Sequence, residues 1–133
     1  MAAYKTKPFN RFARKARISD SDLWEAARRA NAGIMDADLG GGVIKQRIAR
    51  LGEGKSGGSR CIVLCLHRGR AVFVHGFEKK DLGNIKANEL EAFRELANVM
   101  LRFSDQEMVQ RVADGALIEI LPQAEETNGR KIS

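Results

Sequence analysis

The sequence predicts a small α+β domain, because helical periodicity near both ends of the chain encloses a strand-rich centre. A chain of 133 residues is long enough for one compact domain and too short for two ordinary ones. Hydrophobic residues make up 44% of it, which is typical of a folded protein. The longest apolar runs, at 61–66 and 71–74, are far shorter than the roughly 20 residues of a membrane-spanning helix, so we expect a soluble protein.

The first third of the chain predicts a short strand over residues 2–7 followed by two helices. Phe9, Phe12 and Ala13 recur at helical spacing among arginines and lysines, which indicates a basic amphipathic helix. Ser19 precedes two aspartates and an apolar stripe, as the N-cap of a second helix does, and Gly33 is its expected end.

The centre of the chain reads as strands. β-Branched residues alternate with polar ones over 43–50, and a glycine-rich loop follows over 52–58. Residues 60–67 and 70–77 predict a hairpin around a tight turn at Arg68 and Gly69. This hairpin is the expected hydrophobic centre of the fold.

The last third returns to helical patterns. A stripe from Leu90 to Leu101 predicts one helix, and Ser104 with Glu107 has the spacing of a capping box that opens another. Residues 117–121 predict an edge strand. We therefore expect a single domain over residues 1–121 and a flexible polar tail over residues 122–133.

A two-residue turn at 68–69 sets a register for the sheet. It aligns Arg60 with Phe77, Ile62 with His75 and Leu64 with Phe73. If Arg50 pairs with Ser59 across the preceding loop, Lys45 lies opposite Leu64 and Arg47 lies opposite Ile62. One face of the sheet would then gather Lys45, Arg47, Arg60, Phe73, His75 and Phe77, and the other face would gather Ile44, Ile48, Cys61, Val63, Cys65, Val72 and Val74.

Positive charge is concentrated in the first part of the chain. Residues 1–80 hold 17 basic and 7 acidic side chains, a net charge of +10, whereas residues 81–133 hold 6 and 10, a net charge of −4. The anion-facing surface is therefore expected within the first 80 residues.

The two cysteines predict buried thiols. Cys61 and Cys65 on one strand would have Cα atoms about 13 Å apart. A disulfide requires less than about 7 Å, so the two cysteines cannot pair. This pattern and the lack of a signal-peptide-like apolar segment at the N-terminus favour the reducing cytoplasm.

Three familiar chemistries fit the sequence poorly. Gly54-Lys55-Ser56 resembles the end of a phosphate-binding loop, but Ala49 stands where that motif needs its first glycine. Cys61, Cys65, His67 and His75 do not converge in the predicted register, so no metal or other cofactor is expected. Neither histidine has an orienting carboxylate nearby for a hydrolytic triad.

The basic face of the predicted sheet admits two interpretations. It could be an ordinary solvated surface, or it could bind phosphates, with Phe73 and Phe77 stacking on unpaired bases or packing in the core. Two observations favour phosphate binding. The basic excess is confined to one half of the chain, and the cations lie on a partly apolar sheet face.

Four ordered strings resemble the RelE-like toxins of type II toxin-antitoxin systems, from Tyr4 to about Ile120. They are YKTKPFNRFARK at 4–15, DADLGGGVIKQR at 36–47, GKSGGSR at 54–60, and VHGFEKK at 74–80 with Asn84–Ile85. The resemblance implies a small curved antiparallel sheet flanked by N-terminal and C-terminal helices. It also implies a bacterial, cytoplasmic protein that a cognate antitoxin neutralises, often one of helix-turn-helix type.

Many RelE-like proteins cleave messenger RNA on the ribosome, and the resemblance implies site residues for that reaction. By position, Lys45, Arg47, Arg60 and Lys79 match the basic catalytic residues of the family. Attack of a ribose 2′-hydroxyl on its phosphate could use Lys45 as base and the two arginines to bind the phosphate, with His75 or Lys79 as acid. The expected RNA-binding residues are Arg50, Lys55, Phe77 and Lys80.

One departure from the family affects the general acid. Some members carry a tyrosine or another acid near the C-terminal strand, whereas the only tyrosine here is Tyr4. Glu119 could replace that group, or it could be an exposed carboxylate on an edge strand. Two alternatives to a messenger RNA endonuclease stay open: a ParE-like inhibitor of DNA gyrase and a noncatalytic RNA-binding module.

Overall fold

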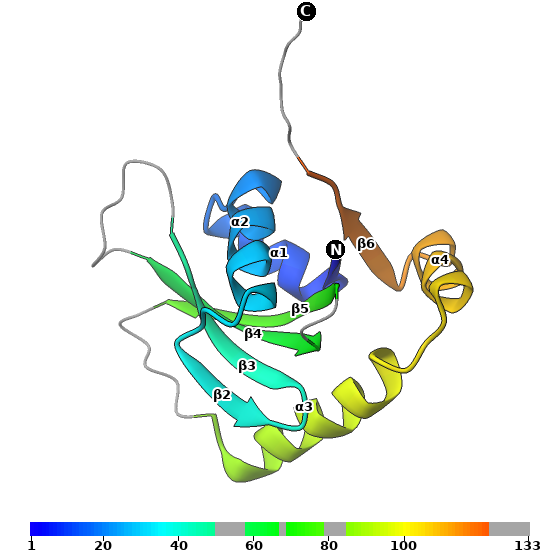
Figure 1. The fold of residues 1–133 in the computed structure, drawn as a ribbon. Helices are drawn as coiled ribbons and strands as arrows, with labels where there is room; N and C mark the ends of the chain where they lie inside the picture. The colour runs from blue at the N-terminus through cyan, green and yellow to red at the C-terminus, as the bar shows by residue number, and fades with distance from the viewer. Residues whose placement is uncertain (50–57, 67–68, 79–84, 123–133) are drawn as a thin grey trace, which may run out of the picture.

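The computed structural model describes residues 1–49, 58–66, 69–78 and 85–122, and within them it confirms the α+β class (Figure 1). In these ranges a six-stranded sheet runs in the order β2-β3-β4-β5-β1-β6, accompanied by four helices. The elements are β1 (Ala2–Thr6), α1 (Lys7–Lys15), α2 (Asp20–Asn31), β2 (Ala37–Gly40), β3 (Val43–Ile48), β4 (Ser59–Leu66), β5 (Arg70–Glu78), α3 (Ala87–Met100), α4 (Asp105–Ala113) and β6 (Leu117–Ile120).

The helix ends follow the predicted capping chemistry. Ser19 caps α2 in a capping box with Asp22, and Ser104 caps α4 in a second box with Glu107. Gly33 follows α2 with a φ of +86°, a left-handed conformation that favours glycine. The expected end of α2 is therefore confirmed.

The sheet is mixed, whereas the family resemblance implied an antiparallel one. β1 pairs with β5 in parallel, with Tyr4 opposite Val72, and the other four pairings of the described sheet are antiparallel. The chain leaves β1 through α1 and α2, so it returns to the sheet far from where it left. β2 was not predicted as a strand, although Ala37 and Leu39 alternate with polar or small residues there.

Each face of the sheet carries its own core, and helices α1 and α2 cover one of them (Figure 1). That core joins Phe9, Leu23 and Ala27 to Ile48 and Phe73. The core of the other face joins residues of β3, β4 and β5 to α3, α4 and β6. Of α3 only Ala97 is buried, and the rest of its apolar stripe is half-buried, so α3 covers that face loosely.

A bulge in the central hairpin corrects the predicted register. Arg60 pairs with Phe77 and Ile62 with His75, as predicted, but Val63 then pairs with Phe73 and Leu64 with Val72. The shift puts Phe73 and the β5 residues before it on the faces opposite to those expected. Phe73 therefore lies with Val63 in the α1–α2 core, and Val72 and Val74 lie in the core of the opposite face.

Several predicted features lie outside the described residues, among them most of the glycine-rich loop, Arg68 of the turn, and residues 123–133 of the tail. Within the part of the chain that is described, no helix combines the length and hydrophobicity that crossing a membrane requires.

Candidate functional site: a basic sheet face

Two rows of paired residues cross strands β3, β4 and β5. Lys45 pairs with Ile62, which pairs with His75 on the next strand. One step along, Arg47 pairs with Arg60, and Arg60 pairs with Phe77. Neighbouring strands lie about 4.8 Å apart, which puts the backbones of Lys45 and His75 roughly 10 Å apart. We call Lys45, Arg47, Arg60, His75 and Phe77 the basic face.

The predicted pairing of β3 with β4 was wrong by two residues. Lys45 was expected opposite Leu64 and Arg47 opposite Ile62, but each lies opposite the residue two positions earlier on β4. Side chains alternate with a period of two, so an even shift leaves every residue on its expected face. The cations therefore share a face, as expected, although their partners differ.

The side chains of the basic face differ in accessibility. His75 is exposed, whereas Lys45, Arg47 and Phe77 are half-buried. Only 15% of the Arg60 side chain is exposed. His75 is thus the most exposed member of the basic face, and most of the Arg60 side chain is covered.

Arg60 is held by an acidic residue that the sequence did not identify. Its Nε lies 3.0 Å from Oδ2 of Asp36, just before β2. The backbone N–H of Asp36 donates to the carbonyl of Lys45 at 3.0 Å. Nη1 of Arg60 is buried and has no hydrogen-bond partner among the described residues. Asp36 thus connects the two strands that carry the cations.

Arg47 and Arg60 meet beside Gly58. A Cβ on Gly58 would lie 3.5 Å from Cγ of Arg47 and 3.7 Å from Nη1 of Arg60. The same Cβ would lie only 3.0 Å from the carbonyl oxygen of Ile48. The two arginine side chains are therefore neighbours, and glycine fits the crowded backbone beside them.

Two aromatic rings lie beside His75. Its ring centroid lies 6.0 Å from that of Phe77 and 5.9 Å from that of Phe93 on α3. The sequence placed Phe93 only in the apolar stripe of its helix. Its contact with the site was not predictable, because it depends on how α3 crosses the sheet. Phe73, the other aromatic residue expected here, is instead fully buried against Phe9, with ring centroids 5.3 Å apart.

Hydrogen bonds to α2 and to Ile34, the third residue after its end, hold strand β3 in place. The buried side chain of Gln46 donates from Nε2 to the carbonyls of Ala26 and Ile34, at 3.2 Å and 2.8 Å. Nη2 of Arg29 donates to the carbonyl of Arg47 at 2.8 Å. These bonds hold the backbone between Lys45 and Arg47, which sets the direction of both side chains.

Four predicted site residues, Lys79, Arg50, Lys55 and Lys80, lie outside the described residues. Glu119 is exposed on β6 and pairs with Tyr4, in the row of Val72 rather than that of His75. Tyr4 itself is buried, and burial raises its pKa. The structure therefore does not bring Glu119 or Tyr4 beside His75.

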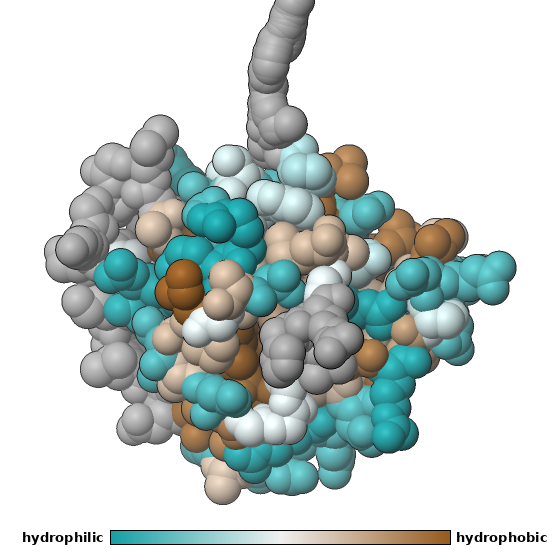
Figure 2. Space-filling model, in the orientation of Figure 1, coloured by the Kyte–Doolittle hydropathy of each residue, from teal (hydrophilic) through white to brown (hydrophobic). Residues whose placement is uncertain are grey.

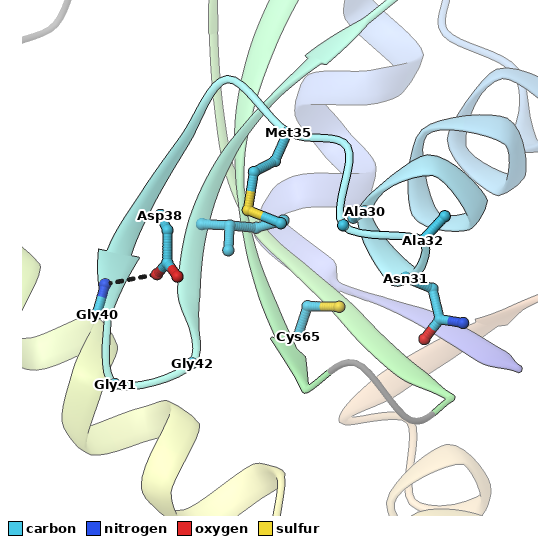
Figure 3. A pocket seen from close by; sticks show the side chains of 11 residues that line it. Ala30, Asn31, Ala32, Met35, Asp38, Gly40, Gly41, Gly42 and Cys65 are labelled. Carbon is cyan, nitrogen blue, oxygen red and sulfur yellow. Dashed lines mark hydrogen bonds between the residues drawn. The ribbon is translucent and has the colours of Figure 1, made fainter.

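A pocket of about 580 Å³ lies on the opposite face of the sheet, between the end of α2 and the β2–β3 turn (Figure 3). Met35, Ile44 and Cys65 give it an apolar wall, and Asp38 is the charged residue among those lining it. Oδ1 of Asp38 accepts from the N–H of Gly40 at 2.9 Å. The described residues that line the pocket include no cation that would bind a phosphate, so their chemistry differs from that of the basic face.

Both cysteines are free and buried, as predicted. Burial raises the pKa of Cys61 far above its usual value and also raises that of Cys65. A protonated buried thiol is a poor nucleophile and a poor metal ligand. Among the described residues, no three histidine, cysteine, aspartate or glutamate side chains are grouped to hold a metal ion.

Figure 2 shows hydrophobic and hydrophilic residues mixed over this side of the molecule. The large apolar side chains that are exposed in the described chain come from different elements: Met1, Ile34, Val99, Val109 and Leu121. Charge, rather than exposed hydrophobicity, distinguishes the candidate site.

Fold and site together define a small α+β protein with cations gathered on one sheet face. The chain matches the family model described as RelE toxin of RelE / RelB toxin-antitoxin system over residues 1–120. It therefore belongs to the RelE toxin family and is a toxin of a toxin-antitoxin system, with a cognate antitoxin as its partner. No curated protein sequence matches it significantly.

Proposed function

We propose that this toxin cleaves messenger RNA on the ribosome without a metal ion and thereby stops translation in the cytoplasm. Membership of the RelE toxin family supports a toxin. The observation that carries the enzymatic part is the pair of rows on β3–β5, which set Lys45, Arg47, Arg60 and His75 on one face. Cations gathered in this way suit a substrate with a polyphosphate backbone.

The proposed reaction is attack of a ribose 2′-hydroxyl on the adjacent phosphorus. The 2′-oxygen forms a bond to phosphorus, the bond to the 5′-oxygen breaks, and the products carry a 2′,3′-cyclic phosphate and a 5′-hydroxyl. Lys45 takes the proton of the 2′-hydroxyl in this scheme. Arg47 and Arg60 stabilise the charge that develops on the phosphate oxygens, a task for which guanidinium groups are well suited.

His75 is our choice for the acid that protonates the leaving 5′-oxygen. It is exposed and lies roughly 10 Å across the sheet from Lys45, so an RNA strand lying between them would have a base on one side and an acid on the other. Lys79 is the alternative acid that the family resemblance implies. The half-buried ring of Phe77 beside His75 offers a surface on which an unpaired base would stack.

The remaining proposed contacts are to RNA phosphates and to the antitoxin. Arg50, Lys55 and Lys80 are proposed to bind the RNA backbone. We propose that the antitoxin, of helix-turn-helix type, covers the basic face or distorts it. We also propose that residues 1–121 form a single domain.

Controlled expression tests this function. The proteins to express are wild type, Lys45→Ala and the matched control Arg102→Ala, and messenger RNA 5′ ends are then mapped genome-wide. Arg102→Ala removes an exposed cation between α3 and α4. We expect growth arrest and codon-phased cuts with wild type and Arg102→Ala, and neither with folded Lys45→Ala. Arrest without cuts would contradict the proposal and make DNA gyrase the next target to assay, while continued growth would favour a noncatalytic module.

A further inference from the structure

The arginines of the basic face stand in an arrangement that needs a counter-charge. Arg47 and Arg60 are direct partners across β3 and β4, and both approach Gly58. Like charges directly opposite each other in a sheet destabilise it. The Asp36 carboxylate, 3.0 Å from Nε of Arg60, supplies the opposite charge.

Asp36 is itself tied to the site. Its backbone N–H donates to the carbonyl of Lys45 on β3, which fixes the backbone from which the carboxylate projects. Only 35% of its side chain is exposed. Because the backbone of Asp36 is held in place, the ion pair restricts the rotation of the Arg60 guanidinium. The guanidinium of a solvated arginine would rotate freely.

The guanidinium retains unused hydrogen-bonding capacity. Nε is occupied by Asp36, while buried Nη1 has no acceptor among the described residues. An unmade hydrogen bond of a buried donor is unfavourable, so an anion that reaches this group gains an interaction already prepared for it.

We propose that Asp36 is a positioning residue for the cleavage reaction: it holds Arg60 through Nε so that the other N–H groups of the guanidinium meet the charge developing on the scissile phosphate. This inference rests on the proposed function. Asp36 does not touch the RNA in this scheme, and its effect passes through Arg60.

Loss of the Asp36 charge should slow turnover without weakening RNA binding. Asp36→Asn keeps the size of the side chain but removes the charge that fixes Arg60. We expect the cleavage rate on programmed ribosomes to fall at least about tenfold, because a guanidinium free to rotate is no longer preorganised. Affinity for a substrate with a 2′-deoxyribose at the cleaved position should stay the same or rise, since a negative charge has left the basic face.

Two further variants control for structural effects. Asp38→Asn removes the same charge two residues further along, from a carboxylate that accepts from the N–H of Gly40, and should leave the rate unchanged. Asp36→Glu restores the charge on a longer stem and should recover part of the rate. Thermal unfolding of each variant shows whether it is folded.

A double-mutant cycle decides whether Asp36 acts through Arg60. In an Arg60→Ala background, Asp36→Asn should cause no further loss of rate, whereas independent effects would multiply. Wild-type rates in Asp36→Asn, or multiplying losses, would overturn this inference while leaving the proposed function intact. If wild type itself does not cleave, the proposed function fails and the inference fails with it. Should Asp36→Asn not fold, Asp36→Glu in both backgrounds gives the same comparison.

Discussion

The ring of Phe12 lies directly against the backbone of Gly76, at the position between His75 and Phe77 on β5. A Cβ on Gly76 would be 2.2 Å from both Cδ2 and Cε2 of Phe12, far inside van der Waals contact. Helix α1 therefore packs on the back of the strand whose other side carries His75. The identity of residue 76 is set by this contact with the helix.

Gly76→Ala should destabilise the protein by about 1–3 kcal/mol, because the Phe12 ring must move to admit a methyl group. The midpoint of urea unfolding measures this change. In a Phe12→Leu background the smaller side chain leaves room, and the cost of Gly76→Ala should shrink. An equal cost in both backgrounds would contradict the contact.

Gln46→Leu should also destabilise the fold. The change removes the donors to the carbonyls of Ala26 and Ile34 and leaves the Ile34 oxygen without that bond, at an expected cost of about 1–3 kcal/mol. Gln110→Leu, on the exposed surface of α4, is the matched control and should stay within about 0.5 kcal/mol of wild type. Similar urea midpoints for the two variants would refute the role of Gln46.

Arg70 fastens the connection between α3 and α4 to the sheet. Its Nη1 donates to the carbonyls of Met100 and Phe103, at 3.0 Å and 2.7 Å, and its Nη2 pairs with Asp105 at 3.0 Å. Arg70→Met should speed amide hydrogen exchange in α4 and lower the melting temperature. The control Arg102→Met should change neither, and unaltered exchange in Arg70→Met would show that the helices are held by other contacts.

Alkaline pH should destabilise the protein through its buried thiols. Burial raises the pKa of Cys61 and Cys65 above the value of 9.0 that they have when exposed. The folded state thus binds these protons more tightly than the unfolded state, so this contribution is complete below pH 9 and is lost as the pH rises above it. Tyr4, whose raised pKa starts from 10.0, acts in the same direction.

Thiol alkylation measures the same burial directly. At pH 8 iodoacetamide should leave both cysteines unmodified in the folded protein and modify both in urea. The free energy of unfolding, measured with urea, should fall between pH 8 and pH 10.5. The fall should be smaller for Cys61→Ala than for wild type, with each protein compared with its own value at pH 8. Fast alkylation of the folded protein would show that the thiols are accessible.

Local sequence signals predicted most helices and strands, because caps and periodicity depend on nearby residues. The starts of α2 and α4 were predicted from the N-caps Ser19 and Ser104, and the β4–β5 hairpin was predicted from its two apolar runs. The parallel pairing of β1 with β5 was not predictable, since it depends on where α1 and α2 return the chain. The bulge that turns Phe73 away from the basic face likewise has no local sequence signal.

The basic face was only partly predictable for the same reason. Alternation along each strand placed Lys45, Arg47, Arg60 and His75 on one face even though the β3–β4 register was wrong by two residues. Asp36 was missed because its partner, Arg60, lies across an intervening strand. Acidic residues beside a cationic strand pattern are a signal that could have identified it.

Purified ribosomes programmed with a defined messenger RNA test the central claim most directly. Wild-type toxin should cut the ribosome-bound RNA and leave fragments with 2′,3′-cyclic phosphate and 5′-hydroxyl ends, while Lys45→Ala at the same concentration should leave the RNA intact. Free RNA should resist both proteins. Intact RNA after treatment with folded wild type, or fragments bearing 5′-phosphates, would contradict cleavage by the basic face.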